Sequence, residues 1–201
     1  MKRASYLYFC FFTLGIFWGC GGTPFLIGDF ESNYKSKVKT IAVMPFSVPA
    51  GNRGAFENRA LLEETITGVL IPVDSARSYL SPFRLRARFE GMADSAILRL
   101  SKDRAGKLLS AEVLLYSEAV RFHPAEGDNP TSRRIGGGKY QRRGVELLME
   151  FRLVEAASSQ LLWKYRVRRF GKDAEEAARM TAQALSRVWP LRAHEPPTPQ
   201  P

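Results

Sequence analysis

Residues 37–46 read Lys-Val-Lys-Thr-Ile-Ala-Val-Met-Pro-Phe, and this pattern predicts a β-strand buried on both faces. Polar and apolar side chains alternate at first, and residues 41–44 then form a continuous apolar run. Short runs that are wholly apolar are typical of a central strand covered on both sides. Pro45 has no backbone N–H, so we expect it to stop the hydrogen-bond ladder.

The rest of the chain continues with helical and strand-like patterns. Helices are expected at Phe56–Ile66, at Gly91–Leu109 in two pieces that meet near Ser101, and at Asp173–Val188. Strands are expected at Glu112–Phe122, Tyr140–Val154 and Gln160–Arg169. Between Pro72 and Phe89 we expect loop with a short strand at Phe83–Phe89, and residues 123–138 also read as loop. This order predicts an α/β fold with a mixed sheet flanked by helices.

The last expected strand shows the clearest alternation of side chains. One face would be wet and cationic, and the other would be buried. The wet face would carry Leu162, Lys164, Arg166 and Arg168, and the buried face would carry Leu161, Trp163, Tyr165 and Val167.

The N-terminus has the pattern of a secretory signal peptide. Lys2 and Arg3 precede an apolar run, Tyr6–Trp18, which is shorter than the roughly 20 residues of a membrane-spanning helix. An uncleaved anchor that extends to Ile27 is the alternative, although Gly19–Pro24 would break such a helix.

Cys20 follows the apolar run directly after Gly19. The chain has 2 cysteines, and the other, Cys10, lies in the segment that cleavage would remove. The Gly-Cys step resembles the lipobox of bacterial lipoproteins, with Phe17 and Trp18 in place of the usual leucine and small residue. We therefore predict Cys20 as the lipidation site; the alternative is an incidental small apolar residue.

The predicted organisation has four parts. They are a lipoprotein signal peptide at 1–19, the lipidated Cys20 with a linker at 20–36, one α/β domain at 37–189, and a disordered proline-rich tail at 190–201. No Asp follows Cys20, so the expected address is the periplasmic face of the outer membrane.

Three motifs resemble the CsgG/LpoB-like lipoproteins and the related TolB N-terminal domain. Residues 41–46 resemble the family's "IAVLPF" strand, residues 109–116 its "LGADAVLxG" strand, and residues 154–163 its "VDAxTGELLW" hairpin. Here Ser110 stands for Gly and Glu112 for Asp in the second motif. In the third, Glu155 stands for Asp and Ser158-Ser159 for Thr-Gly. The resemblance implies an anticodon-binding-domain-like fold and members that act by binding, such as secretion-pore subunits and activators of cell-wall synthases.

No arrangement of residues predicts catalysis, a metal site or a cofactor. His123 and His194 lie far apart in the sequence, and the acid pairs Glu63-Glu64 and Glu175-Glu176 read as solvated helix faces. Residues 133–139 contain three glycines between basic residues but lack the P-loop order, so we interpret them as a flexible loop.

The net charge of +10 favours anionic partners. The residues expected to contact an anionic surface are Arg142, Arg143, Arg166, Arg168 and Arg169; an ordinary solvated sheet face is the alternative.

Three functions remain open at this point. The first is a membrane-anchored, non-catalytic binding module that serves secretion, envelope assembly or a cell-wall synthase through an unknown envelope protein. The second is a self-associating subunit of an outer-membrane secretion complex, hence a homo-oligomer. The third is an enzyme, which no sequence motif supports. A nucleic-acid partner is not expected.

Overall fold

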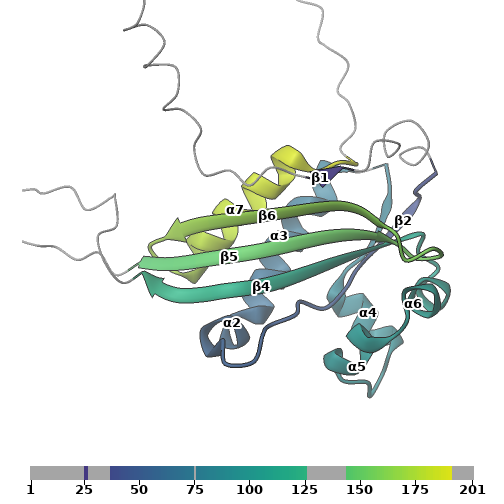
Figure 1. The fold of residues 1–201 in the computed structure, drawn as a ribbon, viewed down its shortest axis with the longest axis horizontal. Helices are drawn as coiled ribbons and strands as arrows, with labels where there is room; N and C mark the ends of the chain where they lie inside the picture. The colour runs from purple at the N-terminus through teal and green to yellow at the C-terminus, as the bar shows by residue number, and fades with distance from the viewer. Residues whose placement is uncertain (1–24, 27–36, 75, 126–143, 192–201) are drawn as a thin grey trace, which may run out of the picture.

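The computed structural model describes residues 25–26, 37–74, 76–125 and 144–191 (Figure 1). The strands are β1 (Phe25–Leu26), β2 (Thr40–Val43), β3 (Ser78–Leu80), β4 (Val113–Ala125), β5 (Gly144–Glu155) and β6 (Leu161–Gly171). The helices are α2 (Arg53–Glu57), α3 (Arg59–Val73), α4 (Pro82–Arg88), α5 (Asp94–Arg99), α6 (Lys102–Leu109) and α7 (Ala174–Val188).

The strands form one mixed sheet in the order β1-β6-β5-β4-β2-β3. β2 runs parallel to both β3 and β4, while β4, β5 and β6 form an antiparallel meander. At the far edge, β1 pairs with β6 through Phe25 opposite Lys164 and Leu26 opposite Trp163. The predicted fold class, a mixed sheet flanked by helices, is confirmed.

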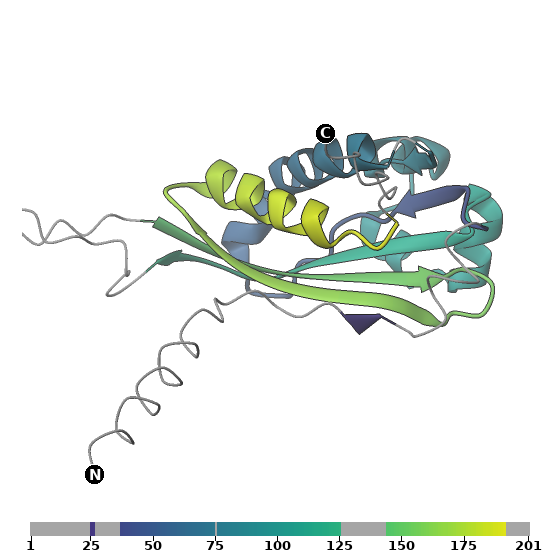
Figure 2. The same ribbon diagram turned by 90° about the horizontal axis from the view of Figure 1, so that it is seen from above.

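Helices cover both faces of β2. Ile41 and Val43 belong to the core beneath α3 and α7, which lie side by side on one face of the sheet (Figure 2). Ala42 and Met44 point the opposite way, into a smaller core made with α4, α5 and α6. All four side chains are 0% exposed, so the prediction of a strand buried on both faces is confirmed.

The smaller core reaches only part of the second face. Its sheet residues come from β2 and from the first part of β4, together with Ala156 just after β5. We call the side of β4–β6 that lies away from α3 and α7, beyond this smaller core, the helix-free face, because no helix of the described residues covers it.

The strand expected at Phe83–Phe89 is not formed. Residues 83–88 belong instead to α4. Ser81 caps this helix, because its Oγ accepts a hydrogen bond from the Arg84 N–H at 3.4 Å. Pro82 follows at the first helical position, where its missing N–H costs nothing. The strand in this segment is the shorter β3, which pairs with β2.

The expected helix at 56–66 is two helices. Asn58 has the non-helical angles φ −99° and ψ 7°, and its side chain donates to the Gly54 carbonyl, which separates α2 from α3. α3 then continues beyond Ile66 and through Pro72, because Leu70 packs in the larger core at 0% exposure.

Two expectations about strand pairing are also corrected. Pro45 interrupts the ladder without ending it, since the Ser47 N–H donates to the Ser117 carbonyl at 2.9 Å. Leu162 is buried at 3% exposure instead of lying on the wet face. A register shift between Leu153 and Val154, opposite this residue, breaks the strict alternation there.

A buried polar cluster joins the two ends of the domain. Asp74 is 0% exposed and accepts two hydrogen bonds from Arg77 and one from the Tyr79 hydroxyl. Trp189 donates to the same hydroxyl at 3.1 Å. Arg77 also donates to the carbonyls of Val38 and Leu191, which lie near the first and last described residues of the domain.

Two serines occupy a backbone conformation that favours glycine. Ser110 has φ +51° and Ser159 has φ +61°, and they are the described non-glycine residues with positive φ. Both are positions at which the CsgG/LpoB-like motifs have Gly. The geometry that the family's glycines suit is therefore kept in this chain although the glycines are not.

We predict that Ser110→Gly and Ser159→Gly each raise the free energy of unfolding by about 0.5–1 kcal/mol, because glycine enters the left-handed region without the cost that a Cβ brings. Urea unfolding at constant m-value measures this change. Ser78→Gly, on β3 with negative φ, is the matched control and should lower stability. Equal or lower stability of the first two variants would contradict the prediction.

Candidate functional site

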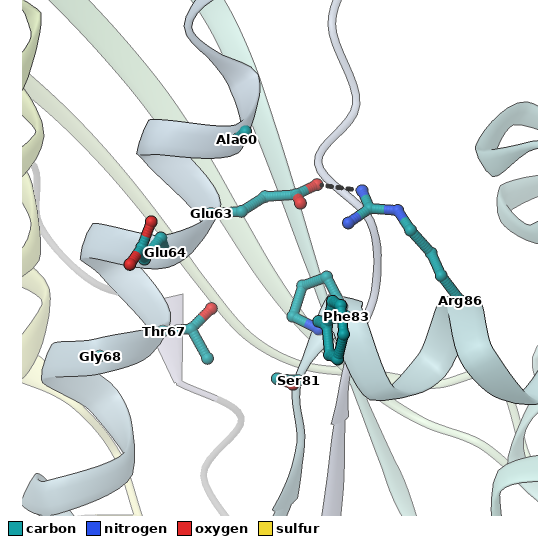
Figure 3. A pocket seen from close by; sticks show the side chains of 9 residues that line it. Ala60, Glu63, Glu64, Thr67, Gly68, Ser81, Phe83 and Arg86 are labelled. Carbon is teal, nitrogen blue, oxygen red and sulfur yellow. Dashed lines mark hydrogen bonds and ion pairs between the residues drawn. The ribbon is translucent and has the colours of Figure 1, made fainter.

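A groove of about 430 Å³ lies between α3 and the start of α4 (Figure 3). α3 lines it with one side of the helix: Ala60, Glu63, Glu64, Thr67 and Gly68. The opposite wall is formed by Ser81, Pro82, Phe83 and Arg86. The i, i+3, i+4 and i+7 spacing on α3 explains why residues apart in sequence share this wall.

Glu63 is the buried acid of the groove, at 6% exposure. Its Oε1 accepts a hydrogen bond from the Phe46 N–H at 2.8 Å and one from Arg86 Nη2 at 2.8 Å. The expectation of a solvated acid pair is therefore wrong for Glu63, because α3 turns this residue toward the end of the β2 segment. Its neighbour Glu64 is exposed, as expected.

Arg86 links Glu63 to a second acid, Asp94. It donates from Nε to Oδ1 at 2.9 Å and from Nη2 to Oδ2 at 2.8 Å, which is a bidentate geometry. Arg59 Nη2 lies 2.5 Å from the same carboxylate. The network of Arg59, Glu63, Arg86 and Asp94 thus holds two cations and two anions.

The network shifts the pKa values of Asp94 and Arg86, the two groups at its centre. The hydrogen bond from Arg86, with the nearby charge of Arg59, lowers the pKa of Asp94 from its ordinary value, while partial burial opposes this shift. The pKa of Arg86 is raised, first by its hydrogen bond to Asp94 and then by Glu63. Both groups are therefore held in their charged forms at neutral pH.

Thr67 and Phe83 add a buried hydroxyl and an exposed aromatic ring to the groove. Thr67 is 6% exposed, and its Oγ1 has no hydrogen-bond partner in the described part of the chain. Figure 3 shows this hydroxyl pointing into the space between α3 and the start of α4. Phe83 on the opposite wall is 80% exposed, so the groove offers a bare aromatic ring opposite a buried hydroxyl. Neither residue was predicted from the sequence to have a functional role.

The arginines expected at an anionic surface do not all lie together. Arg166 and Arg168 are exposed on the helix-free face, whereas the alternation of β6 places Arg169 on the side of α7. Arg166 makes no ion pair within the described residues, and Arg168 Nε lies 2.6 Å from Glu146 Oε1. Arg142, Arg143 and Cys20 lie outside the described residues.

The helix-free face carries acids as well as bases. β5 places Glu146 and Glu150 beside β6, and Lys164 Nζ lies 3.0 Å from Glu150 Oε1. Arg152 pairs with Glu118 of β4 at 3.3 Å. The alternation within one strand could not show this, because the neighbouring charges depend on the cross-strand register.

The ranges that the structure describes contain neither a metal-binding cluster nor a membrane-spanning helix. There, no group of three or more His, Cys, Asp or Glu side chains could hold a metal ion, and no helix is long and apolar enough to cross a bilayer. His123 is exposed on β4, and His194 lies outside the described ranges.

No family model matches the chain, and no curated protein matches it. Among solved structures it is similar to a PelC dodecamer from Paraburkholderia phytofirmans, at 13% identity and a TM-score of 0.46, covering 86% of this chain and 99% of that one. It is similar to a lipoprotein from Neisseria meningitidis at 11% identity and a TM-score of 0.49, covering 74% and 96%. The LpoB C-terminal domain from Salmonella enterica follows at 14% identity and a TM-score of 0.41, covering 65% and 82%.

LpoB gives its name to the group that the three sequence motifs resemble. The class that the chain's own strand order defines is an α/β domain with a mixed sheet and two helical layers.

We predict that Asp94→Asn lowers the free energy of unfolding by about 2 kcal/mol at pH 7, because two arginines lose their charged partner. A carboxyl whose pKa is lowered by folding adds stability above its unfolded-state value, and this gain is lost as the pH falls through the folded-state value. The difference between wild type and variant should therefore shrink below the ordinary pKa of 3.8.

Urea unfolding at pH 7 and at a series of acidic pH values measures both effects. Asp103→Asn on α6 is the matched control, because its ion pair with Lys107 is exposed on the surface. If the difference in unfolding free energy between wild type and Asp94→Asn did not change with pH, the lowered pKa of Asp94 would be contradicted.

Proposed function

We propose that this protein is a membrane-anchored envelope lipoprotein whose domain acts as a non-catalytic binding module on the periplasmic face of the outer membrane. The observation that carries the proposal is Cys20, which stands after a signal-like apolar run and is the one cysteine that would survive cleavage. Acyl chains on this thiol would hold the domain at the bilayer, at about 0.8 kcal/mol per buried CH₂.

The pairing of β1 with β6 supports this arrangement. Phe25 lies opposite Lys164 at the edge of the sheet, and it follows Cys20 by only five residues. A chain of that length spans at most about 18 Å when fully extended. A lipid on Cys20 would therefore keep the β6 edge close to the bilayer surface.

Arg166 and Arg168 are the side chains we propose to meet anionic headgroups. They follow Lys164 by two and four residues on β6, and both are exposed. The distance along the strand is roughly 7–14 Å, within reach of the tether. Arg169 lies on the other side of the strand and is left out of this contact.

We predict that Cys20→Ser abolishes incorporation of labelled fatty acid and moves the protein from the membrane to the soluble fraction of the envelope. Metabolic labelling followed by fractionation measures both. Cys10→Ser, in the segment to be cleaved, is the control and should change neither. Tight membrane attachment of Cys20→Ser would refute the lipid anchor.

The headgroup contact makes a separate prediction. Each arginine near an anionic surface adds about 1 kcal/mol, so Arg166→Gln with Arg168→Gln should weaken binding to phosphatidylglycerol-containing vesicles by about tenfold or more. The unlipidated Cys20→Ser protein is used in co-sedimentation, and its binding should fall as salt rises. Arg169→Gln is the control, and an equal loss with it would exclude a contact specific to the helix-free face.

A further inference from the structure

We propose that the groove between α3 and α4 binds the guanidinium group of an arginine side chain from a partner protein. The proposal names the chemistry of the partner and rests on the role of the domain as a binding module. It does not depend on the lipid anchor, because the groove residues and Cys20 are separate parts of the chain.

The buried Thr67 hydroxyl is the first argument for a ligand. A buried polar group without a hydrogen-bond partner destabilises the folded state, and native structures keep few of them. Thr67 Oγ1 has no partner within the described residues and points into the groove (Figure 3). A donor that enters the groove would satisfy it.

The charges of the groove favour a cation. Arg86 is neutralised by Glu63 and Asp94, and Arg59 shares the same acids. Glu64 lies outside this network and makes no ion pair in the described part of the chain. Its carboxylate is therefore the uncompensated charge of the groove, and it lies three residues before Thr67 on the same side of α3.

Phe83 makes a planar cation the best match. Its ring is 80% exposed on the wall opposite α3. A guanidinium group can stack on such a ring while its donors reach the Thr67 hydroxyl and its charge is attracted by Glu64 on the α3 wall, which a compact ammonium does less well. Space is available, because a Cβ added at Gly68 would meet nothing within 4 Å.

An arginine of a protein partner fits the shape of the site. The groove is open to solvent and small, so it suits the end of one long side chain that a folded surface presents. Arginine is enriched among the residues that dominate protein interfaces, and its rigid fork loses little freedom for each hydrogen bond made.

The test uses the full mature chain in detergent micelles and N-acetyl-arginine methylamide as the probe. We expect an NMR titration with this probe to give a dissociation constant on the order of 1 mM. The largest changes in amide chemical shift should be at Thr67, Gly68 and Phe83. The citrulline analogue has nearly the same shape without the charge, and it should bind at least about tenfold more weakly.

Matched variants locate the binding. Glu64→Gln and Thr67→Val should each weaken binding about fivefold or more, since each removes one acceptor. Thr67→Ser keeps the hydroxyl and should restore binding. Glu57→Gln, an exposed acid of α2 outside this groove, should bind like the wild type.

Three results would overturn the proposal. The first is equal binding of the citrulline analogue. The second is a set of amide chemical-shift changes that map away from the groove. The third is no chemical-shift change at probe concentrations well above the expected dissociation constant. Cys20→Ser should leave arginine binding unchanged, so a failure of the lipid anchor and a failure of this groove are separate outcomes.

Discussion

The structure depends on the placement of β2 between two parallel neighbours with both of its faces buried. β3 and β4 satisfy its backbone groups, and alternate side chains enter two different cores. No polar residue could replace Ile41–Met44 without entering one of these cores unpaired. The strand therefore fixes where both helical layers lie, and the groove is built beside the Pro45 interruption of its ladder.

The groove follows from a single hydrogen bond at that interruption. The Phe46 N–H donates to Glu63, which holds α3 beside the end of the β2 segment. Glu63 in turn requires Arg86, because a carboxylate at 6% exposure needs a charged partner. The pair sets the separation between α3 and α4, and the small side chain of Ala60 and the absence of one at Gly68 leave the space between them open.

Local patterns in the sequence were sufficient for most of the long elements, and the second half of α3 is the exception. β4–β6, α7 and the break between α5 and α6 follow apolar spacing and capping signals, and each was expected near its observed position. The Ser81-Pro82 start of α4 is also a local signal, and it was read as loop. β1 and β3 are too short for any pattern, since they form by pairing with strands far along the chain.

The candidate site was less predictable because it depends on contacts between elements. Glu63 pairs with Arg86 across 23 residues, and no spacing on one helix indicates that contact. The Arg59–Glu63 step on α3 is the one local hint of an ion pair. Ser110 and Ser159 were not predicted to be left-handed, although they occupy positions where the resembled motifs have glycine.

The polar cluster around Asp74 bears on how the domain opens. Arg77 holds the carbonyls of Val38 and Leu191, and Trp189 hydrogen-bonds to Tyr79, so both ends of the domain share one buried anchor point. Fraying from either terminus must break the same cluster. The amide hydrogens at both ends are thereby tied to one cooperative unit, and their exchange with solvent should follow the opening of that unit instead of the independent loosening common at chain ends.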